Sequence, residues 1–127
     1  MRDGLRHRQI VRNATIEEAK DAIVGYTVLN DLSSRERQTR VMPVNMGPAP
    51  GKDFGNVMGK YLVTRDEIPD LGACGMRAYV NGEQWTDGRY GTVQHSFESM
   101  VAFASTSRTF YPGDILGSGT VGTGCGA

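Results

Sequence analysis

The chain has 127 residues, of which 14 are basic and 14 acidic, so its formal net charge is zero. This length suits one domain at most, and a hydrophobic content of 39 % is enough for a packed core. The balanced charge argues against binding to nucleic acid or to a membrane surface. No apolar stretch approaches the length of a membrane span, and two cysteines are too few for a disulfide scaffold. These features predict a cytoplasmic domain.

The N-terminal residues 1–12 are rich in arginine and lack the apolar stretch of a signal peptide. We expect them to form an exposed or disordered leader, followed by a single domain over residues 13–127. The first predicted helix begins after Thr15, because Thr15 and Glu18 have the spacing of a capping box. Its apolar residues recur at helical spacing until Gly25 ends the pattern.

The segment after this helix predicts a strand, a long loop and a hairpin. Residues 26–29 are aromatic, β-branched and apolar, which favours a strand entering the core. Residues 42–56 contain three prolines and three glycines and predict a loop, after which residues 61–64 predict a short strand. The pair Asn81-Gly82 lies between two alternating runs and predicts a type I′ hairpin turn.

The C-terminal part predicts one more helix and one more strand. Apolar residues at helical spacing indicate a helix over 96–110. The stretch 114–120 then predicts a strand that opens into a glycine-rich tail. Two short helices among several short strands predict a strand-dominated α+β domain.

The first polar cluster follows the strand at 26–29 and consists of Asn30-Asp31 with Ser33, Arg35 and Gln38. A carboxylate such as Asp31 at the end of a buried strand is costly unless it is paired or binds a metal. Arg35 could pair with it, which would be a purely structural role. Alternatively Asp31 is a ligand of a hard cation, while Arg35 and Gln38 hold an oxyanionic substrate through the guanidinium fork and the amide.

Two glycine-rich segments form the other candidate sites. Lys52 follows Gly51 in a loop whose backbone could approach a ligand, and it could stabilise developing negative charge or be a solvated loop lysine. Residues 117–124, GSGTVGTG, could form a nest of backbone N–H groups for an anion, with a hydroxyl from Ser118 or Thr120. No helix is expected after these glycines, so a dinucleotide-binding fold is not indicated.

Four segments follow one another along the chain: GYTVLNDLSSRERQ, GKDFG, VNGEQWTDG and YPGDILGSGTVGTG. In this order and at these spacings they resemble the C-terminal catalytic domain of the fumarylacetoacetate hydrolase family, over roughly residues 13–126. The resemblance implies a mixed β-roll, usually a homodimer, and a divalent cation, most often Mg²⁺, with Mn²⁺ or Ca²⁺ as alternatives. It implies a small 2-oxo or 1,3-dicarbonyl acid as substrate, and hydrolytic C–C cleavage or related enolate chemistry.

The resemblance also implies roles for individual residues. Asp31 would be a metal ligand, and Lys52 would be the catalytic residue beside the metal and the substrate. The substrate-binding residues would be Arg35, Gln38 and Thr120. A hard cation with oxygen ligands can bind a 2-oxo acid through its carboxylate and keto oxygens and stabilise an enolate as a Lewis acid.

One feature departs from the family pattern. Family members normally take further metal-binding glutamates from a Glu-x-Glu segment before the first helix, and residues 1–12 contain no glutamate. We therefore expect an incomplete catalytic domain that binds Mg²⁺ weakly by itself and is completed by an upstream segment. The alternative is a catalytically inactive remnant that acts as a binding or oligomerisation module.

Overall fold

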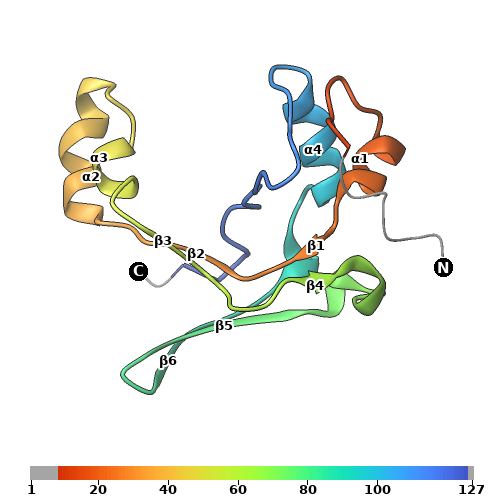
Figure 1. Cartoon of the computed structure of the whole chain (residues 1–127). Coiled ribbons are helices and arrows are strands. Elements are labelled where there is room, and N and C mark those ends of the chain that lie inside the picture. Colours follow the sequence, from red (N-terminus) through yellow and green to blue (C-terminus); the bar gives the residue numbers. More distant parts are fainter. Residues whose placement is uncertain (1–8, 126–127) are drawn as a thin grey trace. The chain divides into compact units, whose positions relative to one another are not determined.

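The computed structural model describes residues 9–125 of the chain (Figure 1). The described chain forms two compact units, each of which is considered by itself. The first unit comprises the chain up to Val24 and from Thr64 onward, and the second unit comprises Gly25–Val63. Strand β1 (Gly25–Tyr26) pairs with strand β4 (Val63–Thr64).

Helices α1 (Ile16–Ala22) and α4 (Phe97–Ser105) pack together and form the core of the first unit (Figure 1). The buried side chains of this core are those of Val11, Ala19, Val101 and Phe110. Ser105 is also fully buried, and its hydroxyl accepts a hydrogen bond from the backbone N–H of Ala14 at 2.9 Å and donates one to the carbonyl of Ala102 at 2.7 Å. The buried Ser105 hydroxyl is therefore satisfied.

The predicted capping box at the start of α1 is confirmed. The Thr15 hydroxyl accepts a hydrogen bond from the backbone N–H of Glu18 at 3.3 Å, and the Glu18 carboxylate accepts one from the backbone N–H of Thr15 at 2.8 Å. The bond from the Thr15 backbone N–H, together with one from the Thr15 hydroxyl at 2.9 Å, stabilises the charged carboxylate and holds the pKa of Glu18 below its ordinary value. The first helix therefore begins where its sequence pattern predicts.

The predicted hairpin is also confirmed. Strand β5 (Gly75–Val80) is antiparallel to strand β6 (Glu83–Arg89), with a bulge between Ala78 and Tyr79. The turn residues Asn81 and Gly82 have φ angles of 52° and 86°, as a type I′ turn requires of both central positions.

The second unit consists of one strand pair and one helix pair. Strand β2 (Leu29–Asp31) is antiparallel to strand β3 (Asn56–Met58), with Asp31 opposite Asn56. Helix α2 (Arg35–Val41) lies against the single turn of helix α3 (Ala49–Lys52) (Figure 1). A short 3₁₀ turn, Met42–Val44, follows α2.

Several predicted elements differ from the structure. The loop predicted at 42–56 contains α3, and the strand predicted at 26–29 is divided between β1 and β2. The helix predicted over 96–110 ends at Ser105, where the hydroxyls of Thr106 and Ser107 donate to carbonyls of the preceding turn and so compete with helix continuation.

The strand predicted at 114–120 is wrong for the described part of the chain, because no other described segment pairs with it. The expectation that Asp31 ends a buried strand is also wrong. Leu29 is half-buried, and Asn30 and Asp31 are exposed. A strand needs a partner and a covering layer, and neither can be derived from its own residues.

The leader predicted over residues 1–12 falls mostly on residues 1–8, which lie outside the described residues. Of the remainder, Val11 is buried and forms an antiparallel bridge with Phe110. Its N–H and carbonyl are bonded to the Phe110 carbonyl and N–H at 3.0 and 2.9 Å. Val11 therefore belongs to the core of the first unit.

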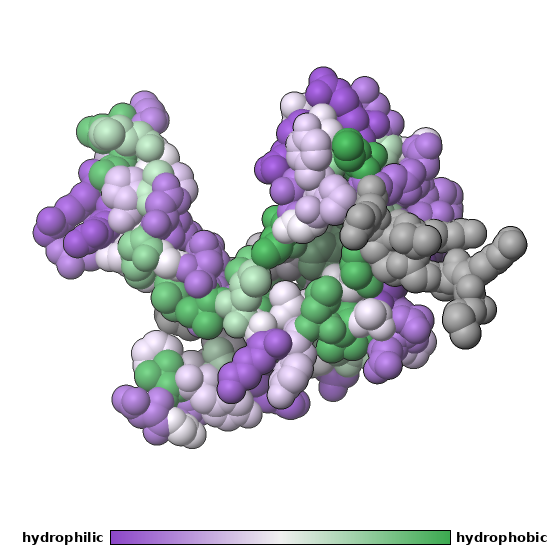
Figure 2. Space-filling view, viewed as in Figure 1, coloured by the Kyte–Doolittle hydropathy of each residue, from purple (hydrophilic) through white to green (hydrophobic). Residues whose placement is uncertain are grey.

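Many large hydrophobic side chains of the described residues are exposed, and Figure 2 shows hydrophobic patches on the face in view. In the second unit the side chains of Val57, Met58 and Leu62 are 49–59 % exposed. The residues of the second unit therefore leave several of its own large apolar side chains exposed.

Over residues 9–125, no helix is both long enough and apolar enough to cross a membrane.

We predict that Gly51→Ala lowers the free energy of unfolding by about 1–3 kcal/mol, the usual cost of overpacking. A Cβ atom at Gly51 would lie 2.8 Å from the Ser34 carbonyl oxygen and 2.9 Å from the Gln38 nitrogen, both of which belong to the backbone at the start of α2. The measurement is denaturant unfolding of the variant and the wild-type chain.

The matched control is Gly55→Ala in the same unit, because a Cβ there would meet only the Leu32 side chain at 3.7 Å. We expect this variant to change the free energy of unfolding by less than about 1 kcal/mol. Equal losses for the two variants would contradict the close approach at Gly51.

Candidate functional site

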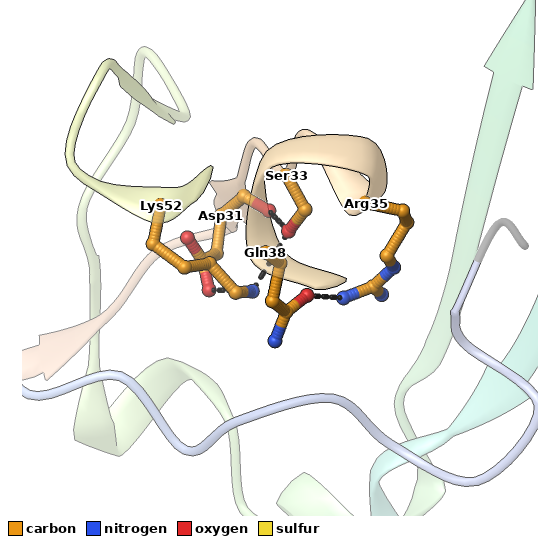
Figure 3. A network of polar contacts seen from close by, with 5 residues as sticks. All are labelled: Asp31, Ser33, Arg35, Gln38 and Lys52. Atoms are coloured by element: carbon orange, nitrogen blue, oxygen red, sulfur yellow. Dashed lines mark hydrogen bonds and ion pairs between the residues drawn. The ribbon is translucent and has the colours of Figure 1, made fainter. Parts of the chain in front are cut away.

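Five polar residues of the second unit gather at one place: Asp31, Ser33, Arg35, Gln38 and Lys52 (Figure 3). We call them the Lys52 cluster. They come from the end of β2, the turn that follows it, the first turns of α2 and the last residue of α3. Residues up to 21 positions apart in sequence are thus brought into contact.

The backbone contact between α3 and the start of α2 explains why Lys52 lies in the cluster. Gly51 is buried against the start of α2, and its carbonyl accepts a hydrogen bond from the Ser34 N–H at 2.8 Å. Only a residue without a side chain fits there, because a Cβ would overlap the backbone of Ser34 and Gln38. The backbone of Lys52, the next residue, therefore lies beside the segment that carries Asp31 and Ser33.

Lys52 makes the two shortest contacts of the cluster. Its Nζ donates a hydrogen bond to Asp31 Oδ2 and another to Ser33 Oγ, each at 2.7 Å (Figure 3). The Lys52 side chain is 27 % exposed and that of Asp31 51 % exposed. An ion pair this open to solvent contributes at most about 1 kcal/mol to stability, so it matters for position more than for folding.

Arg35 and Gln38 form the other half of the cluster. Arg35 Nη1 donates a hydrogen bond to Gln38 Oε1 at 2.9 Å, which leaves the Gln38 amide nitrogen as a donor. Figure 3 shows Gln38 between Arg35 and Lys52. The structural alternative, in which Arg35 pairs with Asp31, is not what the structure has, since Lys52 makes that ion pair.

Thr120, the remaining predicted substrate-binding residue, belongs to the first unit. Its place beside the cluster stays a prediction. Ser33 had no role assigned from the sequence, although it lies within the first motif. The signal that could have identified it is its position two residues after Asp31, at the turn between β2 and α2.

The cluster fits a divalent cation in part. Asp31 Oδ2 is bonded to Lys52, whereas Asp31 Oδ1 accepts no hydrogen bond among the described residues. Within residues 9–125 no group of three His, Cys, Asp or Glu side chains could hold a metal ion. The cluster can therefore supply one carboxylate oxygen to a hard cation, with water or substrate oxygens as the other ligands.

A groove of about 380 Å³ in the first unit is lined by Arg77, Asp87, Arg89, Thr92 and Thr123, among others. Its polar side chains mostly bond to one another or to the groove's own backbone. Arg77 pairs with Asp87 at 3.2 Å, and the Thr123 hydroxyl donates to the Asp87 carbonyl at 2.9 Å. The Lys52 cluster is the better candidate, because it brings together Asp31, Arg35, Gln38 and Lys52, the residues of the first two motifs to which the resemblance assigns a site role.

Sequence comparison gives a family and several relatives. The model of the family described as fumarylacetoacetate (FAA) hydrolase C-terminal matches residues 6–127. A curated "Putative hydrolase" of Burkholderia ambifaria is 35 % identical over 107 residues, which are 83 % of this chain and 38 % of that protein. The chain thus spans well under half the length of the curated relatives that it matches.

Solved structures give the same fold. A 5-carboxymethyl-2-hydroxymuconate delta-isomerase of Mycobacterium smegmatis matches with a TM-score of 0.69 and 27 % identity, over 84 % of this chain and 40 % of that chain. A fumarylpyruvate hydrolase of Pseudomonas aeruginosa, in complex with Mn²⁺ and pyruvate, matches with a TM-score of 0.73 and 21 % identity, over 85 % and 51 % of the two chains.

These matches confirm the predicted α+β class, in which helices α2 and α3 join the two helices expected from the sequence. The chain therefore belongs to the fumarylacetoacetate hydrolase family.

Proposed function

We propose that the chain forms part of the active site of a hydrolase or lyase that acts on a small 2-oxo or 1,3-dicarbonyl acid. The reaction is C–C bond cleavage or related enolate chemistry with a divalent cation, Mg²⁺ or alternatively Mn²⁺ or Ca²⁺. The observation that carries the proposal is the Lys52 cluster, in which lysine, arginine and amide donors lie beside one carboxylate. The P. aeruginosa relative in complex with Mn²⁺ and pyruvate, itself a 2-oxo acid, supports this substrate class.

Arg35 and Gln38 are proposed to bind the acid group of the substrate. A guanidinium can hold a carboxylate through two parallel hydrogen bonds. The bond from Arg35 to Gln38 Oε1 fixes which way the amide faces, so that the Gln38 amide nitrogen adds another donor. Thr120 is proposed to contribute from the first unit.

Lys52 is proposed to stabilise the negative charge that develops on the substrate oxygen when an enolate forms. A lysine ammonium carries three N–H donors, of which Asp31 and Ser33 accept two. The third donor is available to the substrate. Donors that are already oriented before the reaction need no reorganisation when charge develops, which is the main source of their catalytic effect.

Asp31 is proposed to hold the cation through Oδ1, the oxygen that Lys52 does not contact. Such a cation would act as a Lewis acid toward the keto oxygen of the substrate. With one carboxylate from the cluster, the other ligands are water and substrate oxygens, and we expect weak binding of the free cation.

A second candidate function is a catalytically inactive binding or oligomerisation module. The observation that favours it is the exposure of large apolar side chains in the second unit, among them Val57, Met58 and Leu62. Association with a second copy of the chain, which the homodimer prediction also requires, would cover such side chains.

We predict that Arg35→Lys weakens the binding of pyruvate about tenfold, because a lysine cannot form the bidentate pair with the carboxylate. The measurement is isothermal titration calorimetry of the chain with pyruvate in the presence of Mg²⁺. Arg37→Lys is the matched control on the same helix, and it should bind pyruvate as the wild-type chain does. Equal affinities for all three proteins would count against Arg35 as the acid-binding residue.

We predict that Mn²⁺ binds the chain weakly and that Asp31→Asn removes this binding, because a neutral amide is a poorer ligand for a hard cation. Electron paramagnetic resonance of free Mn²⁺ measures the bound fraction. Asp53→Asn removes an exposed carboxylate of the same unit and should leave Mn²⁺ binding unchanged. Binding that survives in the Asp31 variant would show that the cation lies elsewhere.

We predict that the chain associates with itself as its concentration rises, because the exposed apolar side chains of the second unit are otherwise left in water. Sedimentation velocity measures the association. Val57→Ser, which makes an exposed position of β3 polar, should weaken it. A chain that stays monomeric and also binds no pyruvate would contradict both candidate functions.

A further inference from the structure

We propose that Ser33 is a positioning residue that fixes the direction of the Lys52 ammonium toward the substrate. The inference rests on the proposed function of the Lys52 cluster and assigns a role to the residue that neither the family match nor the motif analysis provides. Ser33 is half-buried at the turn between β2 and α2, and its hydroxyl lies 2.7 Å from Lys52 Nζ (Figure 3).

The geometry of an ammonium group gives Ser33 this role. The three N–H donors of Lys52 point in directions fixed relative to one another. One contact, to Asp31 alone, would leave the other two donors free to rotate about it. The second contact, to Ser33 Oγ at the same distance of 2.7 Å, removes that freedom, so the third donor points in one direction.

The hydrogen of the Ser33 hydroxyl is already committed elsewhere. Ser33 Oγ donates to the backbone carbonyl of Asp31 at 3.1 Å. A serine hydroxyl has one hydrogen to donate, so toward Lys52 it acts as an acceptor. Hydrogen bonds linked in this order strengthen one another. This direction also argues against a nucleophilic serine activated by Lys52, since a nucleophile would donate its hydrogen to the lysine nitrogen.

The low exposure of the Lys52 side chain makes its position better defined than that of a charged side chain in a typical surface ion pair. Its side chain is 27 % exposed. In the Glu36–Arg40 pair on α2 of the same unit the two side chains are 76 % and 73 % exposed. A long lysine side chain loses rotamer freedom when it is held, and the Ser33 contact helps to offset that cost. Ser33 therefore acts through Lys52 and is not itself expected to touch the substrate.

The first test measures how ordered the Lys52 ammonium is, by NMR relaxation of the side-chain nitrogens. Lys20 and Lys60 are the other lysines of the chain and provide exposed references. Ser33→Ala should lower the order of Lys52 toward that of these references, and Ser33→Thr, which keeps a hydroxyl, should retain it. Should the alanine variant fail to fold, Ser33→Cys provides a side chain of similar shape with a weak acceptor.

The second test measures pyruvate affinity by calorimetry. Ser33→Ala should weaken it about tenfold, the loss expected for one hydrogen bond to a charged group, and Ser33→Thr should restore it. When Lys52 is already replaced by alanine, Ser33→Ala should cause no further loss, because Ser33 acts through Lys52.

The outcomes separate this inference from the proposed function. Equal order of Lys52 in the wild-type chain and in Ser33→Ala overturns the positioning role, as does an equal loss in the alanine and threonine variants. If the wild-type chain binds no pyruvate, the proposed function fails, and the order of Lys52 still decides whether Ser33 positions it.

Discussion

The close approach of the Gly51 backbone to the first turn of α2 is the constraint on which the Lys52 cluster depends. The Ser34 N–H bonds to the Gly51 carbonyl at 2.8 Å, and no Cβ fits between the two segments. Because α3 is a single turn that ends at Lys52, the contact at Gly51 also fixes the position of the Lys52 backbone. Side chains can adjust only within that limit, so the backbone brings Lys52 to Asp31 and the ion pair refines its position.

The charges of the cluster explain why it suits an acid. Lys52 and Arg35 each carry a positive charge, whereas Asp31, which pairs with Lys52, is the one carboxylate of the cluster. The net charge of the cluster is therefore positive, and the Gln38 amide presents a hydrogen-bond donor in the same cluster. The proposed acid substrate would meet both charge and hydrogen bonds there, which is how sites for small carboxylic acids gain affinity and orientation together.

The parts of the fold that were predicted from sequence depend on neighbouring residues. The capping box of Thr15 and the Asn81-Gly82 turn are local, and both are confirmed. The motifs also indicated which residues gather around Lys52. The sequence does not predict the helical turn of α3, because the prolines and glycines of residues 47–51 are typical of a loop. The role of Ser33 was missed as well, because it depends on a lysine 19 positions away. Long-range contacts of this kind leave no local pattern.

The exposure of Asp31 changes the argument for a cation. The sequence indicates a bound metal as one way to offset the desolvation cost of a carboxylate that is buried at the end of a strand. At 51 % exposure the Asp31 side chain needs no such compensation, and Lys52 already pairs with one of its oxygens. The case for a cation therefore rests on the chemistry of the family and on the second oxygen, Oδ1. In the proposed function Asp31 would serve both partners at once: Oδ2 accepts the hydrogen bond from Lys52, and Oδ1 would be the ligand of a cation that the substrate helps to bind.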